Sequence, residues 1–113
     1  MDTLMLSPSE DDIQVAAELL KKSEVVAIPT ETVYGLAANA FDEEAVRKIF
    51  KAKGRPCDNP LIVHISDLDM IKDIASEVPA LAMKCAERFW PGPLTMIMPK
   101  SDRIPLVTSG GLD

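Results

Sequence analysis

Cationic, amide and imidazole side chains gather in one short stretch of the chain, residues 51–65, which reads KAKGRPCDNPLIVHI. Lys53 and Arg55 flank Gly54, a residue suited to the left-handed position just past the end of a helix. Two prolines keep the following turn semi-rigid and push the residues before them, Arg55 and Asn59, towards extended conformations. A planar guanidinium beside a compact ammonium is a combination that binds polyphosphate. The stretch therefore predicts an anion site at the end of a helix.

Each of these features also has an interpretation that needs no ligand. Lysine and arginine in the last turn of a helix stabilise the helix dipole. A single histidine in an apolar strand, such as His64, is usually a core residue whose hydrogen bonds are satisfied. Thr30, Thr32 and Tyr34 would share one face of an extended segment and could line a polar cavity, but threonine and tyrosine are also ordinary strand formers. The residues alone leave both interpretations open.

Four helices are predicted to position these side chains. Their predicted N-terminal residues are Ser7, Asp42, Ser66 and Pro79. The first helix begins with the capping box SPSE, in which Ser7 is the N-cap, and the third is short, over residues 67–76. The second carries an apolar stripe at helical spacing: Ala45, Val46, Ile49 and Phe50.

Apolar runs predict the strands. They lie at residues 25–28, 61–65, 94–98 and 104–107. In the second of these runs, His64 faces away from its apolar neighbours, and the WPGP sequence before the third run predicts a rigid corner. A turn at Ser109–Gly111 offers backbone amides to an anion. The succession of helices and strands predicts an α/β fold with helices on the faces of a sheet.

Composition limits the class of protein. The 113 residues are 47% hydrophobic, which is enough for one domain with a modest core. A net charge of −6 argues against a protein that coats nucleic acid. Cys57 and Cys85 lack metal-ligand spacing and are interpreted as reduced thiols, and no signal peptide or membrane span is expected. We therefore expect a cytoplasmic protein that does not bind a membrane.

Three motifs together resemble the threonylcarbamoyl-AMP synthase family, whose domain is called YrdC-like. They are PTETVYGL at residues 29–36, KGRP followed by NPL and a histidine at 53–64, and WPGPLT at 90–95. They occur in the family's order, and the resemblance runs from about Ile13 to Asp113. It implies an α/β fold with a twisted mixed β-sheet flanked by helices. It also implies a single YrdC-like domain over residues 1–113, which corresponds to the N-terminal part only.

The resemblance implies a reaction and a set of site residues. L-threonine, bicarbonate and ATP would give threonylcarbamoyl-AMP and pyrophosphate, and the product would feed N6-threonylcarbamoyladenosine formation in tRNA. Lys53 and Arg55 would be catalytic and bind the triphosphate, with Asn59 as a further nucleotide contact. The side chains implied for L-threonine are Thr32 and His64, with Thr30 nearby. Mg²⁺ is expected to accompany ATP, because the chain offers too few cations for a triphosphate, and no protein metal site is expected.

Other functions fit the same residues. An RNA-binding module without catalysis, for double-stranded RNA or tRNA, would use the same cations, although the acidic balance argues against it. The carbamoyl-adenylating domain of hydrogenase-maturation enzymes shares the motifs, but two isolated cysteines disfavour it. Family members continue past Asp113 and later supply a Ser-x-Asn motif. We therefore also expect an incomplete sheet that self-associates through its open edge. A further alternative is an inactive fragment, with weak or no activity.

Overall fold

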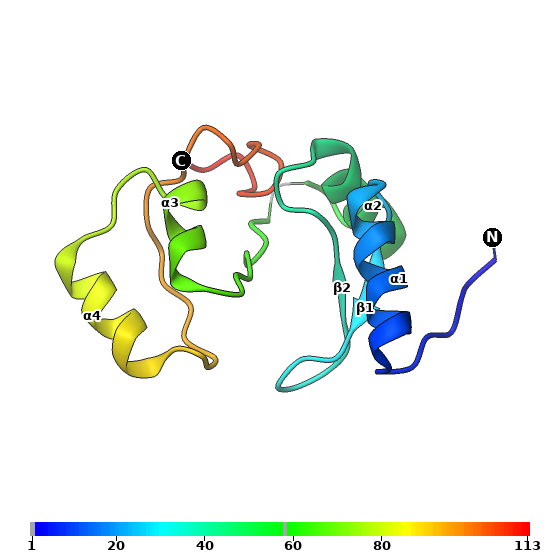
Figure 1. The fold of residues 1–113 in the computed structure, drawn as a ribbon. Coiled ribbons are helices and arrows are strands. Elements are labelled where there is room, and N and C mark those ends of the chain that lie inside the picture. The colour runs from blue at the N-terminus through cyan, green and yellow to red at the C-terminus, as the bar shows by residue number, and fades with distance from the viewer. Residues whose placement is uncertain (1, 58) are drawn as a thin grey trace. The chain divides into compact units, whose positions relative to one another are not determined.

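The computed structural model describes residues 2–57 and 59–113, and regular elements occur in both halves of the chain (Figure 1). The chain divides into a first unit, Met1–Arg55, and a second unit, Pro56–Asp113. Each unit is described by itself. Among the described residues no helix is both long and apolar enough to cross a membrane.

The first helix, α1, spans Glu10–Lys21 and begins two residues later than the sequence predicts. The N-cap is Ser9, whose hydroxyl accepts a hydrogen bond from the N–H of Asp12 at 3.2 Å. The prediction of Ser7 as the N-cap is wrong because the Asp12 carboxylate holds Ser7 outside the helix, accepting its N–H at 2.7 Å and its hydroxyl at 2.9 Å. The N–H of Ser7 is the main cause that lowers the pKa of Asp12.

Strands β1 (Val26–Ile28) and β2 (Gly35–Ala37) form an antiparallel pair. Their register places Val26 opposite Ala37 and Ile28 opposite Gly35. Val26 and Ile28 are half-buried while Ala27 is exposed, so the strand is less buried than its unbroken apolar run predicts. The α/β class is confirmed, and the sheet among the described residues consists of these two strands.

Helix α2 spans Glu43–Lys53 and follows its predicted outline closely. Asp42 is the N-cap and accepts the N–H of Ala45 at 3.2 Å. The hydroxyl of Ser23 and then the N–H of Ala45 lower the pKa of Asp42, because both hydrogen bonds favour the carboxylate. The predicted apolar stripe is almost fully buried, and its members are Ala45, Val46, Ile49 and Phe50. Burying each of the three larger side chains stabilises the fold by about 1.5–3 kcal/mol. This burial fixes the orientation of α2 and so the position of its C-terminal end.

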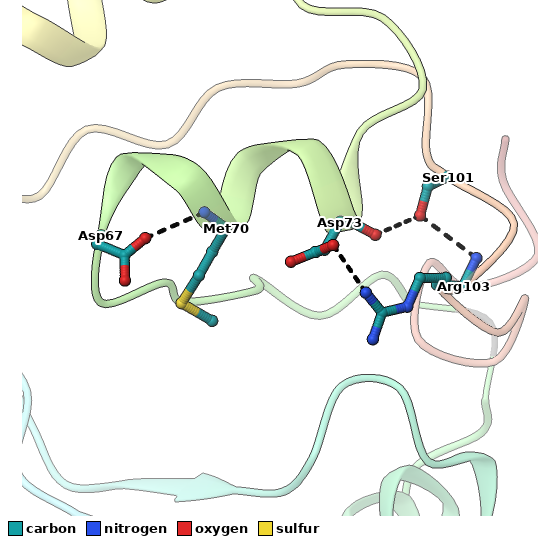
Figure 2. A network of polar contacts seen from close by, with 5 residues as sticks. All are labelled: Asp67, Met70, Asp73, Ser101 and Arg103. Atoms are coloured by element: carbon teal, nitrogen blue, oxygen red, sulfur yellow. Dashed lines mark hydrogen bonds and ion pairs between the residues drawn. The ribbon is translucent and has the colours of Figure 1, made fainter.

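The second unit begins its regular structure with a 3-10 turn, Leu68–Met70, followed by the one-turn helix α3, Ile71–Ile74. The predicted helix over 67–76 is therefore shorter, and Asp67 caps it by accepting the N–H of Met70 at 3.2 Å (Figure 2). Ser66, the predicted cap, instead contacts the Met70 sulfur. The helix ends because Ala75 is extended and forms an antiparallel bridge with Lys100.

Helix α4 spans Ala80–Phe89, with Pro79 at its N-cap as predicted. It ends at Trp90, which precedes a cis peptide bond to Pro91. The indole N–H of Trp90 donates to the carbonyl of Leu94 at 2.8 Å and so closes the predicted corner.

Three predicted strands do not form in the part of the chain that the structure describes. Residues 61–65 alternate between half-buried and exposed positions as a strand would, but they pair with no strand there, and the N–H of Leu61 donates to the carbonyl of Thr108 at 2.9 Å. Residues 94–98 likewise pair with no strand, and residues 104–107 lie in a series of turns. The buried side chains of this unit are Ile71, Ala75, Ala86, Ile104, Val107 and Thr108. Of the three apolar runs, only 104–107 supplies buried residues, and Ile62 and Ile97 of the other two are exposed. An apolar run by itself therefore specifies neither a strand nor burial.

Candidate functional site

The cationic end of α2 is fixed by backbone hydrogen bonds. Gly54 has a φ of 64°, its N–H donates to Lys51 at 3.2 Å, and the N–H of Arg55 donates to Phe50 at 3.0 Å. This pair of bonds is the Schellman arrangement of a helix C-terminus. A Cβ on Gly54 would have no atom within 4 Å, so the left-handed conformation, not lack of space, favours glycine here. The predicted role of Gly54 is confirmed.

The side chains of Lys53 and Arg55 project from this end into solvent. Among the described residues neither makes an ion pair or a hydrogen bond. Elsewhere on the same helix, Arg47 pairs with Glu43 at 2.6 Å and Lys48 pairs with Glu24 at 3.5 Å. In the described part of the chain, the side chains of Lys53 and Arg55 are therefore available for a ligand.

The electrostatics of this helix end constrain what it can bind. The C-terminus of a helix carries a partial negative charge, so it favours Lys53 and disfavours an anion near the backbone. The backbone N–H groups of Gly54 and Arg55 are already used. Any phosphate here must therefore be bound by the charged ends of the Lys53 and Arg55 side chains, away from the helix backbone. This differs from the many phosphate sites that use the backbone N–H groups of a helix N-terminus.

Thr30 and Thr32 lie in the connection between β1 and β2, where residues 31–33 bend. The chain is not extended there, so the argument that alternate residues share a face does not apply. The Thr30 hydroxyl accepts the N–H groups of Thr32 at 3.3 Å and Val33 at 3.2 Å, and donates to the Val33 carbonyl. The Thr32 side chain is exposed and makes no hydrogen bond among the described residues.

Asn59 and His64 belong to the second unit and are both exposed. The interpretation of His64 as a core residue is therefore wrong. Its Nδ1 lies 3.2 Å from the carbonyl of Ile62. Because a carbonyl only accepts, Nδ1 is the donor in that contact, and in the tautomer protonated at Nδ1 the other ring nitrogen, Nε2, is an acceptor. Such a nitrogen suits a ligand that brings a hydroxyl or an ammonium group.

Two other features predicted or examined as ligand sites are not supported. The amides of Gly110 and Gly111 donate to the carbonyls of Val107 and Leu106, at 3.4 and 2.8 Å, so they are not free for an anion. An open apolar depression in the second unit is lined by Ile97, Met98, Pro99 and Asp113, and no candidate site residue lines it. In the described part of the chain, no group of three or more His, Cys, Asp or Glu is placed to hold a metal ion.

A polar network in the second unit has no counterpart in the sequence analysis (Figure 2). The Ser101 hydroxyl donates to the backbone carbonyl of Asp73 at 2.5 Å and accepts the N–H of Arg103 at 3.3 Å. The Arg103 guanidinium pairs with the Asp73 carboxylate at 2.7 Å. Ser101 and Arg103 lie 28 and 30 residues from Asp73 in the sequence, so no local sequence pattern predicts these contacts. This network joins the end of α3 to the segment after Lys100.

Comparison with known proteins gives a consistent match. The model of the Sua5/YciO/YrdC family, described as telomere recombination, matches residues 18–113. The threonylcarbamoyl-AMP synthase of Pyrococcus abyssi is 55% identical over 101 residues, covering 89% of this chain and 30% of that protein. The threonylcarbamoyl-AMP synthase of Bacillus subtilis is 54% identical over 107 residues, covering 93% and 31%.

A solved structure matches equally well. The crystal structure of P. abyssi Sua5 complexed with L-threonine superposes with a TM-score of 0.93 at 50% identity, covering 98% of this chain and 34% of that one. The chain thus spans about a third of the length of these relatives.

Proposed function

The chain belongs to the Sua5/YciO/YrdC family, and we propose that it supplies phosphate- and threonine-binding residues of a threonylcarbamoyl-AMP synthase. The resemblance seen in its three motifs is confirmed by the family match and by the identity to two synthases. The observation that carries the proposal is the similarity to a Sua5 structure that contains L-threonine. Lys53 at the end of α2 and Arg55 just past it support the proposal, because their side chains have no partner among the described residues.

The proposed reaction has two steps. The amine of L-threonine attacks bicarbonate to form a carbamate with loss of water. A carbamate oxygen then attacks the α-phosphorus of ATP, and pyrophosphate leaves. Neither step needs a nucleophilic side chain, so the protein's contribution is to position the reactants and neutralise the leaving charge.

We assign Lys53 and Arg55 to the triphosphate, where the guanidinium holds two oxygens and the ammonium acts as a point charge. Asn59 is assigned to the nucleotide, and Thr32 and His64 to L-threonine. Mg²⁺ is proposed to come with ATP, bound by its phosphates.

The link to tRNA is proposed to be the product. Threonylcarbamoyl-AMP would be consumed in forming N6-threonylcarbamoyladenosine, and the family relationship supports a role in tRNA modification. The net charge of −6 does not favour broad contact between this chain and RNA. A small activated product, not a surface of this chain, is therefore the proposed connection.

Pyrophosphate release tests the proposal. The assay uses ATP, Mg²⁺ and bicarbonate, and it compares L-threonine with L-valine, which has nearly the same shape but no hydroxyl. The chain is assayed alone and as a chimera in which it replaces the matching segment of P. abyssi Sua5. A site built to bind the hydroxyl should prefer L-threonine by a factor on the order of 10⁴. Equal rates with the two amino acids in the chimera would contradict the proposal.

A further inference from the structure

The Thr30 hydroxyl has no hydrogen-bonding capacity left for a ligand. A hydroxyl offers one donor and two acceptor lone pairs. In the β1–β2 connection all three are used, by the N–H groups of Thr32 and Val33 and by the carbonyl of Val33. All three partners are backbone groups of the loop. Thr30 therefore ties the loop to itself, in the manner of a serine–threonine turn.

The same bonds hold the backbone of Thr32 but not its side chain. Its N–H is held by Thr30, which fixes the backbone, while its side chain is exposed and has no partner among the described residues. A Cβ added at Gly35, the first residue of β2, would lie 3.7 Å from the Cγ2 of Thr30, so the Thr30 methyl lies beside the start of that strand.

We infer that Thr30 is a positioning residue, which shapes the loop so that Thr32 is presented to the amino-acid substrate, and that Thr30 does not itself bind L-threonine. This inference rests on the proposed function, in which Thr32 is a threonine contact. It replaces the expectation that Thr30 is a ligand beside Thr32. A preformed loop lets Thr32 bind without first losing conformational freedom, which is where Thr30 adds affinity.

Two substitutions separate the hydroxyl of Thr30 from its shape. Thr30→Val keeps the volume and loses all three hydrogen bonds, while Thr30→Ser keeps the bonds and loses the methyl. We expect Thr30→Val to weaken L-threonine binding by about tenfold, the effect of losing net hydrogen bonds of ordinary strength. Thr30→Ser should stay within about twofold of the wild type, since only the methyl group is lost. Isothermal titration calorimetry on the chain and on the P. abyssi chimera measures both affinities, with thermal melting as a check of folding.

A double substitution tests whether Thr30 acts through Thr32. If it does, Thr30→Val combined with Thr32→Val should bind L-threonine no more weakly than Thr32→Val alone, because there is no Thr32 hydroxyl left to position. Additive losses would show that Thr30 contacts the ligand directly and would overturn the inference.

Amide hydrogen exchange gives a readout that needs no ligand. The N–H groups of Thr32 and Val33 should exchange slowly in the wild type and in Thr30→Ser, and faster in Thr30→Val. Unchanged exchange in Thr30→Val would overturn the inference while leaving the proposed function intact. A wild-type chain and chimera that both fail to bind L-threonine, with exchange behaving as expected, would instead overturn the proposed function and the substrate part of the inference with it.

Discussion

Two arginines in different regions of the molecule are held in opposite ways. In the second unit, the Arg103 guanidinium meets the Asp73 carboxylate at 2.7 Å, and the Arg103 N–H is held by Ser101 (Figure 2). At the end of α2, the backbone N–H of Arg55 is bonded to Phe50, but its side chain has no partner in the described part of the chain. The Arg103 side chain is held by partners in the fold, while Arg55 is hydrogen-bonded through its backbone alone.

This difference separates structural cations from candidate functional ones. The dipole of α2 gives Lys53 and Arg55 a modest stabilising role, of about 0.3–1 kcal/mol at an exposed site. Stabilising the helix dipole requires a positive charge but not a guanidinium. It also does not require the rigid turn at Gly54. The Schellman bonds hold the position of Arg55 without its side chain, so the side chain is free to act on a ligand. We therefore expect substitutions in the two regions to affect different properties.

The largest expected effect is on catalysis at Arg55. In the P. abyssi chimera, Arg55→Ala should reduce pyrophosphate release by about 10²–10³-fold, because a charge-stabilising group is lost. Arg55→Lys should also be poor, since an ammonium cannot hold two oxygens in a fork. The melting temperature should hardly change in either variant.

Arg47→Ala is the matched control for Arg55. Arg47 lies on the same helix and is paired with Glu43, so its loss should leave the rate unchanged. Full activity of Arg55→Lys would show that a positive charge alone is needed, and the two-oxygen contact would then be wrong.

A smaller effect, on stability alone, is expected at Ser101. This half-buried hydroxyl satisfies the carbonyl of Asp73 and the N–H of Arg103. Ser101→Ala should lower the free energy of unfolding by about 1–3 kcal/mol, because both groups lose a partner. Urea unfolding measures the change. Chimera activity should remain at the wild-type level, and a large loss of activity with unchanged stability would place Ser101 in the functional region.

A smaller effect than at Ser101 is expected at Gly54, where the fold depends on backbone conformation. Gly54→Ala should cost about 1 kcal/mol, since an L-residue at a φ of 64° is strained although space is available. Gly54→Asn should cost less, because asparagine adopts this conformation more readily. Urea midpoints of the two variants give the comparison, and equal costs would show that the turn does not depend on the left-handed conformation.

Features set by neighbours in the sequence could be predicted. The cap at Asp42, the buried stripe of α2, the left-handed Gly54 and the opening of α4 at Pro79 each depend on residues within about one turn of helix. The N-cap of α1 shows that even such local features can depend on one further side chain. Ser7 and Ser9 both suit an N-cap, and the Asp12 carboxylate, which bonds to Ser7, decides between them.

Features set by distant partners could not be predicted. Residues 61–65 have the burial alternation of a strand, yet the strand requires a neighbour that the apolar pattern does not specify. The bond from Ser101 to Asp73 spans 28 residues and leaves no local signal. In the candidate site, the sequence identified the residue types at Lys53 and Arg55, but the saturation of the Thr30 hydroxyl depends on how the loop bends.

A paired measurement on Arg55→Ala and Arg103→Ala tests the central claim most directly, with the rate of pyrophosphate release and the free energy of unfolding determined for both chimeras. Arg55→Ala should lose about 10²–10³-fold in rate with little change in stability. Arg103→Ala should keep its rate and lose about 0.2–1 kcal/mol, because the pair with Asp73 is 60% and 50% exposed. Similar rates in the two variants would contradict the account, because the unpaired arginine would then have no functional role that the paired one lacks.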